Sequence, residues 1–94
     1  MTIVWSRRAL THLTALRARI ARDSEESAAA VAKRILNVVD LLETQPNLGR
    51  PGRLPAIREL LVTGTPYLIP YRVRHERLEL LAVFHGRQKW PTKL

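Results

Sequence analysis

The stretch from Tyr67 to His85 constrains the fold more than any other part of this chain. It contains two apolar runs of strand length, 67–74 and 78–85, joined by a short polar connection. A third run, 58–62, precedes them, and turn residues or charged pairs bound all three. Apolar runs of this length with turn signals between them are typical of β-strands. The three runs therefore predict a small meandering sheet.

The register of the last two strands follows from their alternation. If the connection is centred on His75 and Glu76, residues whose numbers sum to 151 face each other across an antiparallel pair. On one face this pairs Arg72 with Glu79, a favourable match of opposite charges. The same face also pairs Leu68 with Val83 and Pro70 with Leu81. The other face becomes uniformly apolar, with the pairs Val73 and Leu78, Tyr71 and Leu80, Ile69 and Ala82, and Tyr67 and Phe84.

Two residues fit a tight regular hairpin poorly. His75-Glu76 is not the Asn-Gly type of pair that two-residue hairpin turns prefer, so we expect a four-residue loop that keeps the same register. Pro70 has no N–H to donate to the ladder, so we expect it at an open edge or at a bulge.

The N-terminal region predicts a strand that leads directly into a helix. Residues 2–5 are β-branched or aromatic, and Ser6 is a favourable N-cap for a helix beginning at Arg7. His12 lies outside the apolar stripe, so we expect it to be solvated. The stripe itself recurs at helical spacing and comprises Leu10, Leu13, Leu16 and Ile20.

A second helix is predicted from about residue 24 to Thr44. Asp23-Ser24-Glu25-Glu26 has the form of a capping box with Asp23 as the N-cap, and Gln45-Pro46 ends the pattern. The short connection and the small residues near its start favour an antiparallel helical hairpin that covers one face of the sheet. Its apolar positions are Ala28, Val31, Ala32, Ile35, Val38, Val39 and Leu42.

The order strand, helix, helix and three strands indicates an α+β fold with a mostly antiparallel sheet. Ninety-four residues are enough for one domain, 1–94, with a single core. No apolar run approaches the length of a membrane span, and the N-terminus lacks the order of regions found in a signal peptide. We therefore expect a cytoplasmic protein that does not bind membranes.

Composition narrows the possible chemistry. The chain has no cysteine, which removes disulfides, thiolate nucleophiles and most structural zinc sites, and its three histidines are too scattered for a metal set. We expect neither a metal nor another cofactor. The formal net charge of +8 favours phosphates, nucleic acid or an acidic protein as partners, although an Arg-rich surface also arises from genomic bias.

Four segments together resemble the RelE/ParE toxins of bacterial type II toxin–antitoxin modules: residues 47–51, 58–60, 67–73 and 83–88. The resemblance covers nearly the whole chain. It implies a helical hairpin on a small sheet and a small acidic antitoxin of the ParD or RelB type, bound in a toxin–antitoxin hetero-oligomer. We expect the antitoxin along the helical hairpin and the exposed face of the sheet. RelE-like members cut messenger RNA on the ribosome, whereas ParE-like members poison DNA gyrase.

One position favours the ParE-like branch. When the tyrosine at the strand centre of the nuclease branch is aligned with Tyr71, Leu68 stands where that branch has a catalytic arginine. The resemblance thus implies inhibition of DNA gyrase in preference to messenger RNA cleavage. An inactive interaction protein that keeps the toxin fold is a third possibility.

The nuclease alternative has its own candidate residues. Metal-free RNA cleavage needs a base near the ribose 2′-hydroxyl, a cation for the phosphate and an acid for the leaving oxygen. His85, Arg87 and Lys89 could supply these groups. Each could equally have a structural role. The candidates for binding a target or its phosphates are Arg50, Arg53, Arg58, Arg72, Arg87, Lys89 and Trp90.

Overall fold

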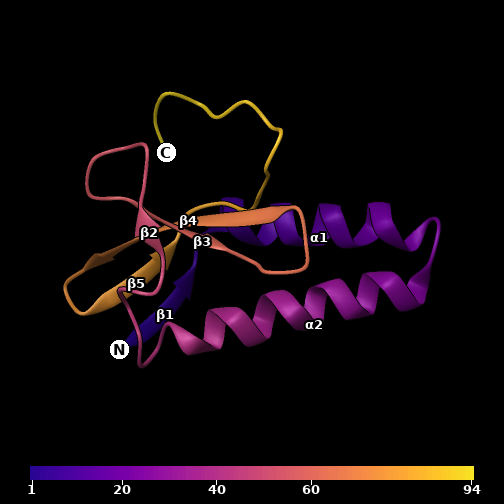
Figure 1. The fold of residues 1–94 in the computed structure, drawn as a ribbon, viewed down its shortest axis with the longest axis horizontal. Helices are drawn as coiled ribbons and strands as arrows, with labels where there is room; N and C mark the ends of the chain where they lie inside the picture. The colour runs from indigo at the N-terminus through magenta and orange to yellow at the C-terminus, as the bar shows by residue number, and fades with distance from the viewer.

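The computed structural model describes residues 1–94 and confirms the α+β class (Figure 1). In chain order the elements are β1 (Thr2–Trp5), α1 (Arg7–Ala21), α2 (Glu25–Leu41), β2 (Arg50–Pro51), β3 (Arg58–Leu61), β4 (Tyr67–Arg74), β5 (Arg77–Leu80) and β6 (Phe84–His85). The sheet order is β1-β5-β4-β3-β2, and β6 pairs with β4. The pairing of β1 with β5 is parallel, and all other pairs are antiparallel. None of the helices has the length and apolar character needed to cross a membrane.

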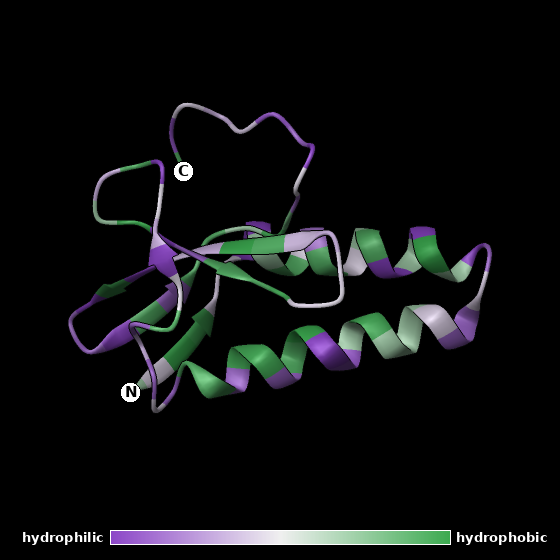
Figure 2. Ribbon diagram, viewed as in Figure 1, coloured by the Kyte–Doolittle hydropathy of each residue, from purple (hydrophilic) through white to green (hydrophobic).

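The helices form the predicted antiparallel hairpin and pack on the sheet. In Figure 1 their connecting turn points away from the sheet, and the C-terminal segment lies on the side of β4 opposite α2. Figure 2 shows hydrophobic residues along β1, β4 and the helices, whereas the C-terminal segment is mainly polar. Strand β4 is central, and its residues from Tyr67 to Tyr71 are all buried. The core includes Ala9, Leu16, Ile35, Val39, Leu60, Ile69, Tyr71, Leu78 and Leu80.

Both helix starts are capped by serine. The Ala9 N–H donates to Oγ of Ser6 at 3.0 Å, as predicted. The α2 cap is Ser24 and not Asp23, because Ser24 has an extended backbone and its Oγ accepts from the Ser27 N–H at 3.0 Å. Asp23 still belongs to the end of α1, since its N–H donates to the Ile20 carbonyl.

The predicted register is confirmed for the first part of the β4–β5 pair and wrong beyond Pro70. Tyr71 to Arg74 pair with Leu80 to Arg77 as expected, but Leu68 then faces Phe84 and Tyr67 faces His85. One extra residue between Leu80 and Phe84 therefore forms a bulge. The Pro70 carbonyl accepts from the Leu81 N–H at 2.9 Å, but Pro70 has no N–H to return. The expected pairs Ile69 with Ala82, Leu68 with Val83, and Tyr67 with Phe84 do not form.

The β4–β5 connection is a two-residue turn and not the expected four-residue loop. His75 and Glu76 alone separate the strands, and their φ angles are 52° and 61°. These left-handed conformations are those that a type I′ hairpin turn requires, and they cost side-chain-bearing residues more than glycine. The strained two-residue turn keeps the register of the flanking strands.

Three side chains lie elsewhere than predicted. Leu10 is 49% exposed and Val73 is 44% exposed, because each lies where no neighbouring element covers its face. His12 is half-buried and not solvated: its Nδ1 accepts from the Val83 N–H at 3.1 Å. That N–H lies within the bulge, so His12 satisfies a donor that the irregular ladder leaves free. Burial and the nearby charge of Arg8 lower the pKa of His12 below its ordinary value.

Candidate functional site

Two segments of the chain are rich in cations, residues 47–59 and residues 85–94. The buried carboxylate of Glu59 organises the first of them, which we name the Glu59 corner. Glu59 is 3% exposed. Its Oε2 accepts from the backbone N–H of Arg53 at 2.8 Å and from Nε of Arg53 at 3.1 Å, and its Oε1 accepts from Nη2 of Arg50 at 3.3 Å. Burial alone would raise the pKa of Glu59, but these hydrogen bonds and charges hold it below the ordinary value. Arg50 and Arg53 are therefore both bound by Glu59, although their side chains remain 62% and 48% exposed.

Tyr71 fixes the other side of the Glu59 corner. Its hydroxyl donates to the Pro46 carbonyl and accepts from the Gly49 N–H, both at 2.8 Å. Nη1 of Arg58 donates to the Gly49 carbonyl at 2.7 Å. A Cβ at Gly49 would lie 2.6 Å from Cε1 of Tyr71, so only glycine fits. Burial raises the pKa of the Tyr71 hydroxyl, which keeps it protonated and able to donate.

The second cationic segment, residues 85–94, is held by local contacts, and we name it the C-terminal segment. Nδ1 of His85 accepts from the Arg87 N–H at 3.1 Å, and the Gln88 N–H donates to the His85 carbonyl at 2.9 Å. The His85 ring meets the Tyr67 ring edge-on at 5.7 Å between centroids. The Tyr67 hydroxyl in turn accepts from Nη2 of Arg19 at 3.3 Å.

Trp90 joins the C-terminal segment to the Glu59 corner. Its ring lies 4.9 Å from the Phe84 ring, and the Cζ atom of Arg53 lies 3.8 Å from the Trp90 ring centroid. A guanidinium above an indole face makes a favourable cation–π contact. Nε1 of Trp90 is buried without a hydrogen-bond partner, which weakens this attachment.

The predicted site residues fall into three groups. Arg50 and Arg53 meet at Glu59, whereas Arg58 turns to Gly49. Arg72 pairs with Glu79 at 2.6 Å, which confirms the expected cross-strand match, and this hydrogen bond lowers the pKa of Glu79.

The remaining candidates lie in the C-terminal segment. His85 and Arg87 touch through the Arg87 backbone, and the side chains of Arg87 and Lys89 form no ion pair. Glu59 was not among the predicted site residues, although a single acidic residue next to an arginine inside an apolar strand is a signal that the sequence contains.

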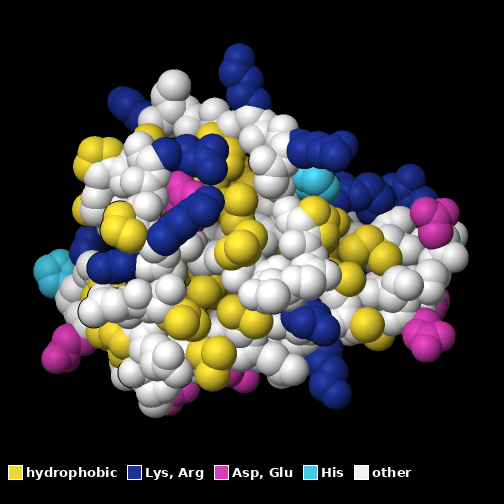
Figure 3. All heavy atoms as spheres, in the orientation of Figure 1, with side chains coloured by type: hydrophobic (Ala, Val, Ile, Leu, Met, Phe, Trp, Pro, Cys, Tyr) yellow, Lys and Arg dark blue, Asp and Glu magenta, His cyan; other side chains and the backbone are white.

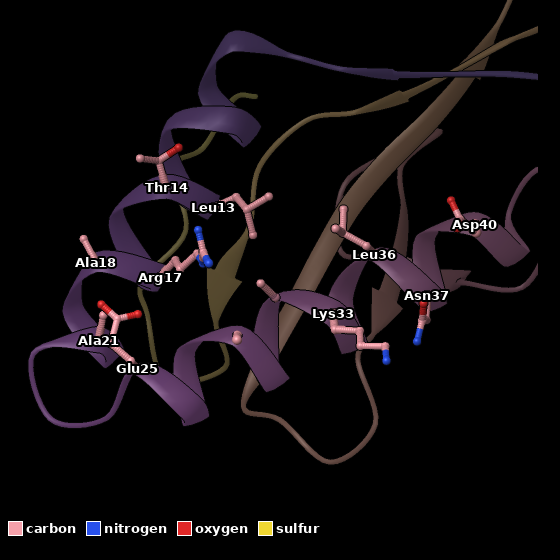
Figure 4. A pocket seen from close by; sticks show the side chains of 12 residues that line it. Leu13, Thr14, Arg17, Ala18, Ala21, Glu25, Lys33, Leu36, Asn37 and Asp40 are labelled. Carbon is pink, nitrogen blue, oxygen red and sulfur yellow. The ribbon is translucent and has the colours of Figure 1, made fainter.

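A groove runs between the helices on the surface of the hairpin (Figure 4). Its volume is about 940 Å³, and its apolar lining includes Leu13, Ala29, Ala32 and Leu36. Arg17 and Lys33 add positive charge, while Glu25 and Asp40 also belong to its wall. On the whole molecule, Lys and Arg side chains gather over the upper part of the face drawn in Figure 3, and acidic side chains lie mainly around its edge. No group of three His, Asp or Glu side chains is placed to hold a metal ion.

Comparison with known proteins adds independent evidence. The family model for the ParE toxin of the type II toxin–antitoxin system parDE matches residues 3–90. The protein Y4kP of Sinorhizobium fredii, a candidate toxin by name, is 44% identical over 92 residues, which cover 98% of this chain and 95% of that protein. Toxin RelE2 of Caulobacter vibrioides is 35% identical over 84 residues, covering 89% and 93% of the two chains.

A solved structure agrees with these sequence matches. A chain of the chromosomal ParDE toxin–antitoxin system from P. aeruginosa superposes with a TM-score of 0.83 and 26% identity, covering 90% of this chain and 95% of that one. The paired helices and mixed sheet are thus those of a solved ParDE component. The chain belongs to the ParE toxin family and is the toxin of a ParDE-type type II toxin–antitoxin system, a context that implies an antitoxin partner.

Proposed function

We propose that this toxin acts by inhibiting DNA gyrase. The observation that carries the proposal is the burial of Leu68. In the nuclease branch of the family, the resemblance implies a catalytic arginine at this position. Leu68 is 5% exposed and faces Phe84 across the β4–β6 pair. A buried aliphatic side chain can neither stabilise a phosphate nor transfer a proton. The match to the parDE toxin family supports the same reading.

The second candidate function is cleavage of messenger RNA on the ribosome. One relative carries the name RelE2, and His85 lies directly beside Arg87. Because Nδ1 of His85 accepts from the Arg87 N–H, the neutral ring carries its proton on Nε2. His85 would therefore present an N–H that can donate to the leaving oxygen, and Arg87 or Lys89 would face the phosphate. Cleavage of messenger RNA would require catalysis without a cation at position 68.

Two assays on the purified chain separate the candidates: gyrase-catalysed supercoiling and DNA cleavage, and messenger RNA cleavage on programmed ribosomes. We expect gyrase inhibition that survives His85→Ala and no RNA cleavage. RNA cleavage that falls about a hundredfold or more in His85→Ala, with supercoiling unaffected, would establish the nuclease instead. A chain that is folded but inactive in both assays and does not arrest growth would be an inactive interaction protein.

The antitoxin is proposed to be a small acidic protein that lays an apolar helix in the groove between α1 and α2. The groove offers an apolar floor, and its two cations, Arg17 and Lys33, are balanced by Glu25 and Asp40. The attraction for an acidic protein comes from the chain as a whole, which carries a formal net charge of +8. An amphipathic helix in a groove is a common mode of peptide recognition, and opposite charge speeds its association. The product is a toxin–antitoxin hetero-oligomer in the cytoplasm.

Filling the groove tests this docking site. Ala29 lines the groove and is exposed, whereas its exposed neighbour Ala30 lies outside it. We expect Ala29→Trp to remain toxic but to lose rescue by the antitoxin encoded beside it, because the indole occupies the helix position. Ala30→Trp is the matched control and should be rescued normally. Equal rescue of both variants would place the antitoxin elsewhere.

A further inference from the structure

The tip of the β4–β5 hairpin holds two arginines that face each other. Arg74 pairs with Arg77 in the register of the antiparallel strands, and both are exposed. Opposed residues in such a pair have Cβ atoms about 4.5–5.5 Å apart, and like charges there destabilise the sheet. Neither arginine forms an ion pair, although Glu76 lies in the adjoining turn and Glu79 is bound by Arg72. The hydrogen bond from Arg72 and, after it, the charges of Arg74 and Arg77 lower the pKa of Glu79. The hairpin thus places three arginines around one carboxylate, and this part of the sheet keeps an excess of positive charge.

The same tip is strained as well as charged. The positive φ angles of His75 and Glu76 are unusual for residues with side chains, and this turn contains no glycine to relieve them. Strain and unfavourable charge pairs that a fold retains are often found where a ligand binds. An anionic ligand would remove the repulsion between the two guanidinium groups.

Alternation along the strands places these arginines on the sheet face without helices. Tyr71 and Leu78 point into the helix-covered core, so Arg72, Arg74 and Arg77 project to the opposite side. Figure 1 shows the turn at the end of the molecule away from the α1–α2 turn, next to the start of β1, whose Thr2 pairs with Arg77. This site is separate from the helix groove and from the Glu59 corner.

We propose that Arg74 and Arg77 bind the phosphate backbone of duplex DNA. The two arginines lie opposite each other at the end of the sheet, where β1 also pairs with β5, and guanidinium groups bind phosphate oxygens in a bidentate manner. Duplex DNA presents such phosphates as a dense row of negative charges. An acidic helix is a poorer match, because the hollow beside the tip has a single apolar lining residue, Met1, and cannot bury the apolar face of a helix. DNA binding goes beyond gyrase inhibition and does not depend on it, since it is a property of the toxin alone.

The affinity of the purified chain for a short labelled DNA duplex, followed by fluorescence anisotropy over a series of salt concentrations, tests the proposal. Each lost phosphate contact lowers the slope of log K against log salt by about 1. We therefore expect the double variant Arg74→Gln/Arg77→Gln to bind more weakly and to show a slope smaller by about 2. Arg74→Lys/Arg77→Lys keeps the charge and should retain most of the slope.

The matched control is Arg7→Gln/Arg22→Gln, which removes the same charge from two exposed residues at the ends of α1, its first residue and its C-cap, neither of which forms an ion pair. Its slope should stay close to that of the unmodified chain. Equal losses in the two Gln double variants would mean that only the overall charge acts, and would overturn the proposal. So would an unmodified chain that binds labelled polyglutamate through Arg74 and Arg77 but fails to bind the duplex, since the ligand would then be a protein.

Discussion

The Glu59 corner and the C-terminal segment look alike in sequence and differ in structure. Both combine Pro and Gly with several cations. In the Glu59 corner, Arg50, Arg53 and Arg58 all have acceptors within the fold, whereas Arg87 and Lys89 of the C-terminal segment have none. The difference arises because one buried carboxylate and one buried tyrosine lie beneath the corner. A cation is free to meet a partner only where the fold supplies no acceptor of its own.

Replacing one glycine in each segment by alanine should give the largest difference in the free energy of unfolding. Gly49→Ala would force a Cβ within 2.6 Å of Tyr71 and disturb the hydrogen bonds at its hydroxyl, so we expect a loss of about 3 kcal/mol in the free energy of unfolding. Gly86→Ala is the control, because the nearest atom to a Cβ there, the Pro66 carbonyl oxygen, is 3.4 Å away. Its cost should stay within about 0.5 kcal/mol in urea denaturation. Similar losses at the two glycines would remove the distinction between the segments.

The next largest effect should come from Glu59 and should depend on pH. Because the folded protein lowers the pKa of Glu59 below its ordinary 4.5, its contribution to stability is present above that pH. The contribution is lost as the pH falls through the lower, folded pKa. Glu59→Gln should cost about 2 kcal/mol at neutral pH and should flatten the decline in stability below pH 4.5.

The comparison for Glu59 is the exposed carboxylate of Glu43, which has no ion-pair partner. Glu43→Gln should keep both the stability and the acid-induced decline of the unmodified chain when unfolding is followed by circular dichroism at several pH values. If the acid decline were equally steep in Glu59→Gln, the charges of the Glu59 corner would not be the source of its stability.

The smallest loss in the free energy of unfolding is expected at Trp90, where the C-terminal segment contacts the Glu59 corner. Trp90→Ala removes the contacts with Phe84 and Arg53, but it also removes a buried N–H without a partner, so the net loss should be about 1 kcal/mol. Trp5→Ala, at a tryptophan packed against the main core, should cost about 3 kcal/mol in the same urea titration. A larger loss at Trp90 than at Trp5 would show that the C-terminal segment is as firmly held as the core.

Periodic patterns in the sequence were sufficient to predict the order of the main elements and half of the register of the β4–β5 hairpin. They were sufficient because one face of each helix and strand is apolar, and because turn residues interrupt the apolar pattern between elements. A bulge was one of the two places expected for Pro70, and a bulge does form opposite that residue. Its position after Leu80 was not predicted, because it depends on which backbone N–H groups the Pro70 carbonyl and the His12 ring accept from. Strand β2 was missed because two residues are too few to show alternation.

The candidate site was less predictable than the fold. The residue type alone was enough to predict the arginines as candidate binding residues. Whether each arginine is free to bind a partner depends on hydrogen-bond acceptors that are distant in sequence or buried. Arg53 illustrates this, because its partners are Glu59 in a neighbouring strand and Trp90 in the C-terminal segment. Arg74 and Arg77 were not predicted as a strand pair, because the expected four-residue loop would have contained both of them. The two-residue turn keeps each of them in its strand, where they face each other.

The parallel pairing of β1 with β5 has a consequence for the rate of folding. The Ser6 side chain donates to the Leu81 carbonyl, and these residues are 75 positions apart. The helical hairpin and the β4–β5 hairpin need only local contacts and can form quickly, whereas closing so long a loop is slow. We therefore expect β1 to dock in a late kinetic step. Until that step is complete, β5 remains an open edge, and the newly made toxin is at its most susceptible to proteolysis and aggregation.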